Sequence, residues 1–351
     1  MIAAIYDPYL DTLGGGERYA MTFGLALLDM GFEVDIFWDD TKIQEKIEKR
    51  FGMHLSKFNF LPNVFSSRNF LGTGFFLKNY HVAFMISDGS IPFMTTKNNI
   101  LHFQVPFRNT RSMNLANRIK IRRIHNIVCN SHFTKKIIDE EYSTNSKVIY
   151  PPVDTLKITP GKKQNIILYV GRFSQLLQNK RHDILIESFK SLIDQGLNDW
   201  KLVLAGGSEV GRTEKVDDLR SVSENYPIEI IENPTFPQIL NLYKKSKIFW
   251  QATGYGIDEN KHPERVEHFG ISVAEAMSAG CAPVVYPKGG IPEIVDDKIN
   301  GFNWFIPKEL TEITLKLITN PQLTNQISAK ASEKAQKFSV SVFKSQVRKL
   351  I

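Results

Sequence analysis

Cysteine is scarce in this sequence of 351 residues, which contains only Cys129 and Cys281. Both cysteines lie in apolar runs, so we expect two buried thiols in a reduced protein and no disulfide framework. The eight histidines are scattered, and together with the cysteines they give no zinc-ligand spacing. These absences predict a cytoplasmic protein without a structural metal.

Long apolar runs are absent as well, since none approaches the roughly 20 residues that a membrane-spanning helix needs. Residues 1–7 lack a basic region and turn polar at Asp7, so they predict a first strand and no secretory signal. The 42% of hydrophobic residues and 23% of charged residues are typical of a globular protein. The length exceeds that of most single cores and predicts two domains.

Acidic residues are missing from residues 89–138, although the whole chain carries a net charge of only +7. This segment alone carries +9, so the rest of the chain sums to −2. Such a basic region could face anionic lipid, a phosphorylated acceptor or nucleic acid, or it could be a solvated helix face. Its cations are Lys97, Arg108, Arg111, Arg118, Lys120, Arg122, Arg123, Lys135 and Lys136.

The first half of the chain alternates short apolar runs with helical patterns. A strand over 2–6, a glycine loop, a helix to about residue 30 and a strand over 33–38 form a βαβ unit, for which we expect a right-handed crossover. The loop is not the dinucleotide fingerprint, because Gly14, Gly15 and Gly16 are adjacent. Further strands are expected near 81–86, 99–103 and 127–130.

A break in composition divides the chain near residue 155. Pro151 and Pro152 are followed by the polar, turn-forming residues 159–163. The strand and helix pattern then starts again at Ile166–Val170. We therefore predict one domain over residues 1–155 and a second over 156–335, with a terminal helical segment over 336–351.

Two carboxylates lie eight positions apart in the stretch from Glu267 to Glu275. Gly270 lies between them and marks the expected start of a helix, which would place Ser272 and Glu275 near one face. The N–H groups at a helix start favour an anion such as diphosphate, and a glycine there allows close approach. Carboxylates accept hydrogen bonds from sugar hydroxyls. The stretch therefore suits a nucleotide sugar.

Two cations follow the first strand of the second domain. Arg172 comes directly after the strand, and Lys180 opens the next helical pattern. Fixed cations stabilise the charge that develops on a departing nucleoside diphosphate, and they can substitute for a divalent metal. Ordinary surface cations are the alternative interpretation.

The stretch resembles the E-x7-E signature of retaining GT-B glycosyltransferases of family 4. The resemblance implies an α/β fold with two Rossmann-like, doubly wound domains that face each other across a cleft, and a C-terminal helix that returns to the first domain. The matching residues are Glu267, Phe269, Gly270, Glu275, Ala276, Ala279, Gly280, Gly289 and Gly290.

The resemblance also implies roles for individual residues. Gly15 and Gly16 would pack against the donor and the acceptor, Arg172 and Lys180 would bind the diphosphate of the donor, and Glu275 would bind its ribose. His102 would lie near the sugar as a catalytic residue, although a buried or capping histidine is the alternative. The donor sugar would contact the catalytic Glu267 and the backbone of Phe269, Gly270, Ile271 and Ser272.

The activity expected from this resemblance is retaining hexosyl transfer to a hydroxyl of a glycan, lipid-linked or similar acceptor. No metal or other cofactor is expected. Residues 262–265 resemble mannosyltransferases of lipid-linked oligosaccharide assembly, so GDP-mannose leads and UDP-hexoses follow as donors. The basic 97–136 region would contact the cytoplasmic face of an anionic membrane, and nucleic acid is not an expected partner. The alternatives are a nucleotide-sugar epimerase on the same fold and a non-catalytic protein that binds carbohydrate or nucleic acid.

Overall fold

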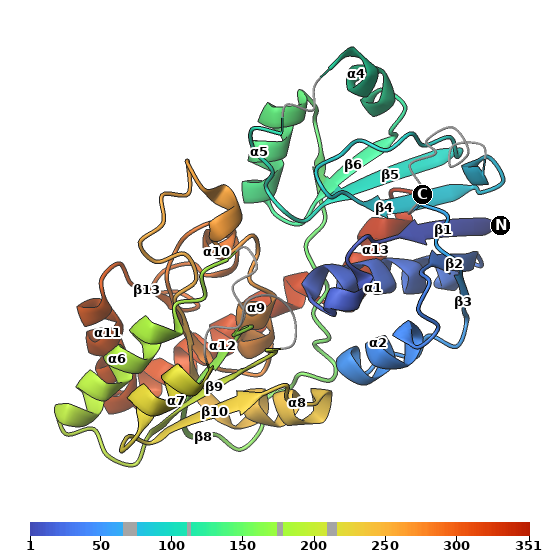
Figure 1. Ribbon diagram of the computed structural model, residues 1–351. Helices are drawn as coiled ribbons and strands as arrows, with labels where there is room; N and C mark the ends of the chain where they lie inside the picture. The colour runs from blue at the N-terminus through green and yellow to red at the C-terminus, as the bar shows by residue number, and fades with distance from the viewer. Residues whose placement is uncertain (66–75, 111–113, 174–177, 209–215) are drawn as a thin grey trace. The chain divides into compact units, whose positions relative to one another are not determined.

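The chain folds into two compact units (Figure 1). A computed structural model describes residues 1–65, 76–110, 114–173, 178–208 and 216–351. The first unit comprises Met1–Pro152 and Val340–Ile351, and the second comprises Val153–Ser339. The change from one unit to the other at Pro152 falls within the proline-rich composition break of the sequence.

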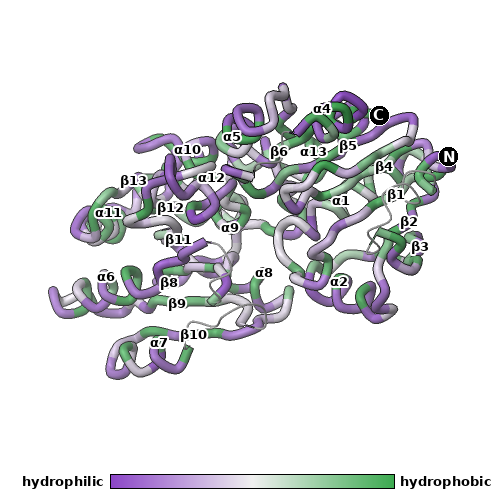
Figure 2. The backbone as a smooth tube through the Cα atoms, turned by 45° about the horizontal axis from the view of Figure 1, so that its top comes forward, coloured by the Kyte–Doolittle hydropathy of each residue, from purple (hydrophilic) through white to green (hydrophobic). Residues whose placement is uncertain are grey.

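The first unit is built on a parallel sheet, which among the described residues has seven strands in the order β3-β2-β1-β4-β5-β6-β7. Hydrophobic residues follow one another along β1, β4 and β5 (Figure 2), as expected for parallel strands that are buried on both faces. The strands are β1 (Ile2–Tyr6), β2 (Glu33–Phe37), β3 (Phe58–Leu61), β4 (Val82–Ile86), β5 (Asn98–Phe103), β6 (Asn126–Cys129) and β7 (Lys147–Val148).

Helices cover this sheet and close two apolar cores. Alternate residues of β4 enter different cores, with Phe84 in one and Met85 in the other. On the Phe84 side, Tyr19 of the first helix meets Phe343 of the last helix edge to face at 4.7 Å. The helices are the short η1 (Leu10–Thr12), α1 (Gly15–Asp29), α2 (Ile43–Phe51), α4 (Leu115–Ile121), α5 (His132–Tyr142) and α13 (Val340–Arg348).

The second unit has a parallel sheet of its own, with six strands among its described residues in the order β10-β9-β8-β11-β12-β13. The predicted doubly wound α/β class is therefore confirmed in both units. The strands are β8 (Gln164–Val170), β9 (Lys201–Gly206), β10 (Ile228–Glu232), β11 (Ser246–Gln251), β12 (Ala282–Val285) and β13 (Phe302–Asn303).

The strand order of the second sheet reverses at β8 and β11. These two strands are neighbours, but the chain leaves β8 toward β9 and later returns to β11 on the other side. Such a reversal opens a ligand crevice at the carboxyl ends of the two strands. The helices around this sheet are α6 (His182–Asp194), α7 (Val216–Ser223), α8 (Phe236–Lys245), η2 (Pro263–Arg265), α9 (Ile271–Ser278), α10 (Ile291–Ile294), α11 (Pro307–Thr319), α12 (Pro321–Ala335) and η3 (Gln336–Phe338).

Among the helices of the described residues, none combines the length and the apolar character needed to cross a bilayer. Both cysteines are buried free thiols, as the sequence predicted. Their burial raises the pKa of each thiol, to about 12 for Cys129, so both are protonated at neutral pH.

Candidate functional site

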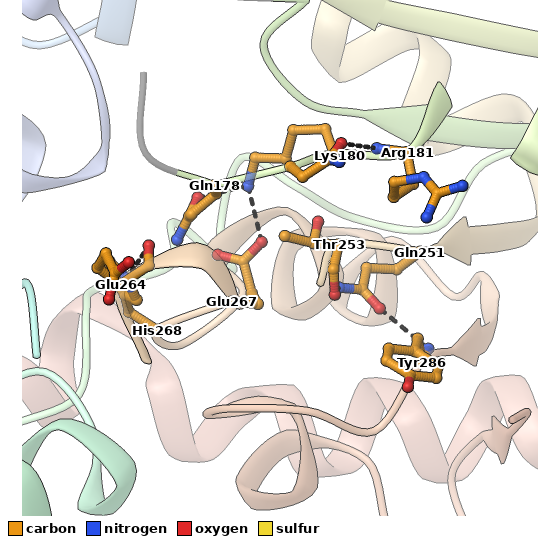
Figure 3. A network of polar contacts seen from close by, with 10 residues as sticks. Gln178, Lys180, Arg181, Gln251, Thr253, Glu264, Glu267, His268 and Tyr286 are labelled. Carbon is orange, nitrogen blue, oxygen red and sulfur yellow. Dashed lines mark hydrogen bonds and ion pairs between the residues drawn. The ribbon is translucent and has the colours of Figure 1, made fainter. Parts of the chain in front are cut away.

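A largely buried ion pair lies at the carboxyl edge of the second sheet, where the strand order reverses. Nζ of Lys180, which follows β8, is 2.8 Å from Oε2 of Glu267, which follows β11. Each side chain is only 14% exposed, and Figure 3 shows the two pointing toward one another. Lys180 also donates to the side-chain oxygen of Gln178 at 2.7 Å. The structure thus brings together two residues that the sequence predicted for the site.

The ion pair sets the charge of Glu267. Burial by itself raises the pKa of this carboxyl, but the attraction and hydrogen bond of Lys180 outweigh burial and hold the pKa below its ordinary value. His268 and Thr253 lower the pKa of Glu267 further, and Thr253 lies beside the carboxylate in Figure 3. Glu267 is therefore an ionised carboxylate at neutral pH, held in place by an ammonium group.

Helix α9 begins just beyond this carboxylate, as the glycine in the sequence predicted. Gly270 is its N-cap and has φ of +109°. A Cβ at this position would come within 2.7 Å of Cδ1 of Ile291, so the backbone conformation and the close packing both require glycine. The ring of Phe269 packs edge to face on Phe338 at 5.2 Å, so the predicted ligand contact of Phe269 rests on its backbone.

Glu275 lies in the middle of α9 and is buried. The hydroxyl of Tyr243, which is itself fully buried in α8, donates to Oε2 of Glu275 at 2.9 Å. This bond orients a carboxylate that the sequence predicted for the ribose. Sequence reasoning missed Tyr243, because helix α8 was not anticipated.

Main-chain contacts support Glu267 from a second glycine turn. The N–H of Gly290 donates to the carbonyl oxygen of Glu267 at 2.8 Å, and a Cβ at Gly289 would lie 2.0 Å from that oxygen. Glu259 accepts from the N–H of Gly289 at 2.8 Å. The glycine pair of the sequence motif therefore packs against the backbone of the site carboxylate.

Arg181 also supports this edge, although no sequence signal singled it out. It caps α6 with a left-handed backbone conformation (φ +53°). Its guanidinium bonds both carboxylate oxygens of Asp183 and donates to the carbonyl oxygen of Tyr255 at 3.0 Å. Its charge also lies 5.3 Å above the ring of Tyr255. Arg181 therefore fixes the backbone between β11 and Glu267.

Arg172 follows β8 at the same edge of the sheet. The flanking residues are held by backbone bonds from Gly171 to Ala205 and from Phe173 to Gly207. No ion pair joins the guanidinium of Arg172 to another residue within the described ranges.

Over those same ranges, no three His, Cys, Asp or Glu side chains are grouped so that they could hold a metal ion.

The remaining predicted residues belong to the first unit. Gly15 is the first residue of α1, and a Cβ on Gly16 would overlap the side chain of Gln104. His102 is fully buried and stacks on the ring of Tyr19 with the ring centroids 4.0 Å apart. Burial lowers the pKa of His102 to about 3, so the imidazole is neutral and is part of the core. Its role near the sugar stays a prediction.

Two parallel, doubly wound units define the GT-B class of glycosyltransferase folds. The profile described as "Glycosyl transferases group 1" matches residues 155–334, and the profile described as "Glycosyltransferase Family 4" matches residues 13–157. The chain belongs to the Glycosyl transferases group 1 family.

Solved structures share the fold over nearly the whole chain. A glycosyltransferase from Rickettsia africae has a TM-score of 0.76 at 16% identity, with 99% of this chain and 98% of that chain covered. Anabaena Alr3699/HepE in complex with UDP-glucose has a TM-score of 0.74 at 17% identity, with the same coverage. At these identities, the similarity shows the fold alone.

Curated relatives include mannosyltransferases. The GDP-Man:Man(3)GlcNAc(2)-PP-Dol alpha-1,2-mannosyltransferase of Dictyostelium discoideum is 29% identical over 230 residues, which cover 62% of this chain and 44% of the relative. The alpha-1,3/1,6-mannosyltransferase ALG2 of Candida glabrata is 24% identical over an alignment of 389 positions, which covers 90% of this chain and 83% of the relative. The match to the Dictyostelium enzyme thus spans less than half of that relative's length.

Proposed function

We propose that this chain transfers a hexose from a nucleotide-diphosphate sugar to a hydroxyl group of a glycan or lipid-linked acceptor. The observation that carries the proposal is the largely buried Lys180–Glu267 pair at the crevice of the second sheet. It places a cation suited to diphosphate beside a carboxylate suited to sugar hydroxyls. The names of the mannosyltransferase relatives favour GDP-mannose as the donor, and the UDP-glucose complex of Alr3699/HepE supports UDP-hexoses as the next choice.

In this proposal, different residues of the second unit bind different parts of the donor. The N–H groups at the start of α9 and the guanidinium of Arg172 receive the diphosphate. The ammonium group of Lys180, which pairs with Glu267, also binds the departing phosphate, on which negative charge develops during transfer. Glu267 then accepts hydrogen bonds from the hexose, and Glu275, oriented by Tyr243, accepts them from the ribose. These groups perform the transfer without a metal ion.

We further propose that the configuration at the anomeric carbon is retained. This part of the proposal comes from the resemblance of the E-x7-E stretch to retaining enzymes. In retention, the acceptor hydroxyl forms its bond to the anomeric carbon on the face from which the diphosphate departs, and its proton passes to that phosphate. Proton NMR of the first product formed distinguishes the retained anomer from the inverted one, and an inverted product would overturn this step.

A thermal-shift panel tests the donor site. GDP, UDP, ADP, GDP-mannose and UDP-glucose are added separately, and binding raises the melting temperature by mass action. We expect GDP and GDP-mannose to give the largest shifts, and Arg172→Ala and Glu275→Ala to abolish them. Arg220→Ala and Glu224→Ala, which change exposed residues of the same unit, are the matched controls and should keep the full shifts.

Each outcome of the panel has a defined meaning. Larger shifts with the uridine compounds would support the proposed donor site but identify a UDP-hexose, in place of GDP-mannose, as the donor. No shift with any nucleotide, together with no release of nucleoside diphosphate in the presence of acceptor pools, would overturn the transferase proposal. Conversion of the nucleotide sugar into its epimer without an acceptor would identify an epimerase instead.

We also propose that helix α4 rests on an anionic membrane. None of its residues is buried, and Leu115 and Ile119, one turn apart, are 76% and 53% exposed. Arg118 and Lys120 add positive charge to the same short helix. Exposed apolar side chains beside cations are typical of helices that lie in the headgroup layer. Arg111 of the basic region belongs to residues 111–113, which lie outside the described residues.

Vesicle sedimentation tests the membrane proposal. We expect the protein to bind vesicles that contain phosphatidylglycerol and to stay unbound with pure phosphatidylcholine. Leu115→Glu with Ile119→Glu should abolish sedimentation. Val222→Glu, which changes an exposed apolar residue of the second unit, should leave it unchanged. Equal binding to both kinds of vesicle, or salt-sensitive binding of RNA alone, would remove this proposal.

A further inference from the structure

The second unit contains a cleft at the amino edge of its sheet. The cleft lies between α12, the end of α11, and the residues that precede or begin β8, β9, β11 and β12. Its volume of about 590 Å³ is within the range of pockets that hold small molecules, about 300–1,000 Å³. All of its walls come from one compact unit.

This cleft is separate from the donor site. All strands of the sheet are parallel, so their amino ends lie at the edge opposite to Lys180 and Glu267. The six residues of β9 separate the two edges by about 20 Å, at roughly 3.3 Å per residue. A nucleotide sugar at the carboxyl edge therefore leaves the cleft open to a different ligand.

One wall of the cleft combines an aromatic ring with a cation. Trp200 and Ile318 line the cleft together with Leu317, and Trp200 is 8% exposed while Leu317 is fully buried. Nζ of Lys247 lies 5.5 Å above the ring of Trp200 and donates to Oδ1 of Asn165 at 2.6 Å. An ammonium has three donors, so Lys247 retains the capacity to bind an anion beside the ring.

The other charged groups in the walls are occupied. Lys163 donates to the carbonyl oxygens of Ser246 at 2.7 Å, Ala279 at 2.6 Å and Tyr243 at 3.4 Å. Together with a contact to Sγ of Cys281 at 3.7 Å, these bonds use its three donors, while its positive charge remains at the wall. Glu333 forms an ion pair with Lys330 at 3.0 Å. The electrostatics of the cleft therefore favour a negative ligand, which Lys247 would bind.

We propose that the cleft binds a small amphiphilic anion. Its aromatic or aliphatic body packs against Ile318 and the exposed part of Trp200, and its carboxylate, sulfonate or phosphate group pairs with Lys247. The proposal follows from the walls of the cleft and does not depend on the hexosyl-transfer activity, so each can fail without the other.

Fluorescence titration with 1-anilinonaphthalene-8-sulfonate tests this site in the whole chain. We expect saturable binding of one probe molecule per chain, which GDP and GDP-mannose do not displace. Ser328→Trp fills the cleft from α12 and should weaken probe binding at least about tenfold. Ser221→Trp makes the same change on an exposed position of α7 and should leave binding at the wild-type level. Circular dichroism melting confirms that each variant is folded.

Lys247→Gln provides a second arm that does not depend on filling the cleft. We expect this substitution to weaken binding of the sulfonate probe about tenfold, because a charge-assisted contact is lost. Binding of the neutral probe N-phenyl-1-naphthylamine should change less than about twofold. The proposal is overturned if binding does not saturate, if nucleotides displace the probe, or if Ser328→Trp behaves like Ser221→Trp. Equal losses of affinity for both probes in Lys247→Gln would also overturn the proposal that Lys247 binds the anionic group.

Discussion

At the scale of single residues, the carboxyl group of Glu267 is buried and Lys180 keeps it ionised. Its pKa in the folded protein lies below the ordinary value, so the ion pair contributes stability above the unfolded pKa of about 4.3. That contribution is lost as the pH falls through the folded pKa. In Lys180→Met, burial remains without the cation, and the pKa of Glu267 should rise above its ordinary value.

This change in pKa has a measurable consequence. The acid limb of the pH profile of kcat/KM should move to higher pH in Lys180→Met. Lys162→Met removes a cation from an exposed position and should leave the limb where it is. An unmoved limb in Lys180→Met would show that the charge of Glu267 does not govern turnover.

Tyr243 is a positioning residue for Glu275, with which it forms a buried hydrogen bond. A hydrogen bond to a charged group contributes about 1.5–3 kcal/mol, so Tyr243→Phe should raise the KM for the donor about ten- to hundredfold. Because the ribose contact is made equally in the ground and transition states, kcat should change less than about twofold. Tyr226→Phe removes an exposed hydroxyl contact to Asp194 and should change neither constant. A fall in kcat with unchanged KM would contradict a positioning role.

At the scale of secondary-structure elements, the start of α9 depends on Gly270. Gly270→Ala places a Cβ in a left-handed conformation and against Ile291, whereas Gly196→Ala imposes the left-handed strain alone, because its Cβ would meet open space. We expect Gly196→Ala to lower the free energy of unfolding by about 1–2 kcal/mol, and Gly270→Ala by about 1–3 kcal/mol more. Urea denaturation measures both losses, and equal losses would mean that the close packing adds nothing.

Much of the fold followed from local sequence patterns. The strands β1, β2, β4 and β8, the helix after Gly14 and the helix after Gly270 are confirmed within a few residues, because parallel strands form continuous apolar runs and glycine marks helix ends. The elements α2, β3 and α8 were missed. Helix α8 carries Pro237 in its first turn, where proline removes no intrahelical hydrogen bond, although proline in a sequence usually indicates a loop.

The candidate site was less accessible to sequence reasoning than the fold. The position after a strand indicated Lys180, and the eight-residue spacing to Glu275 indicated Glu267. Their pairing joins positions 87 residues apart and depends on the neighbouring β8 and β11. Tyr243 and Arg181 gave no signal, because tyrosine and arginine at helix ends serve many purposes. His102 lies in an aromatic stack, which no local pattern distinguishes from an open site.

At the scale of the whole molecule, the two proposed ligands bind opposite edges of one sheet. Hydrogen exchange should therefore separate them. A nucleoside diphosphate should slow exchange within 266–275, and 1-anilinonaphthalene-8-sulfonate should slow exchange within 321–335, relative to the ligand-free protein. Protection of both segments by either ligand alone would mean that the two edges do not bind independently.

The contacts of Lys163 have a consequence for protein engineering. One ammonium joins the carboxyl-terminal ends of α8 and α9 through the carbonyl oxygens of Ser246 and Ala279, and the same two helices carry Tyr243 and Glu275. A chimaera that imports only one of these helices from a homologous enzyme would combine ends and side chains that are not matched to each other. Exchange of donor preference between homologues should therefore transfer residues 236–281 as a single block, together with the lysine that joins the two helices.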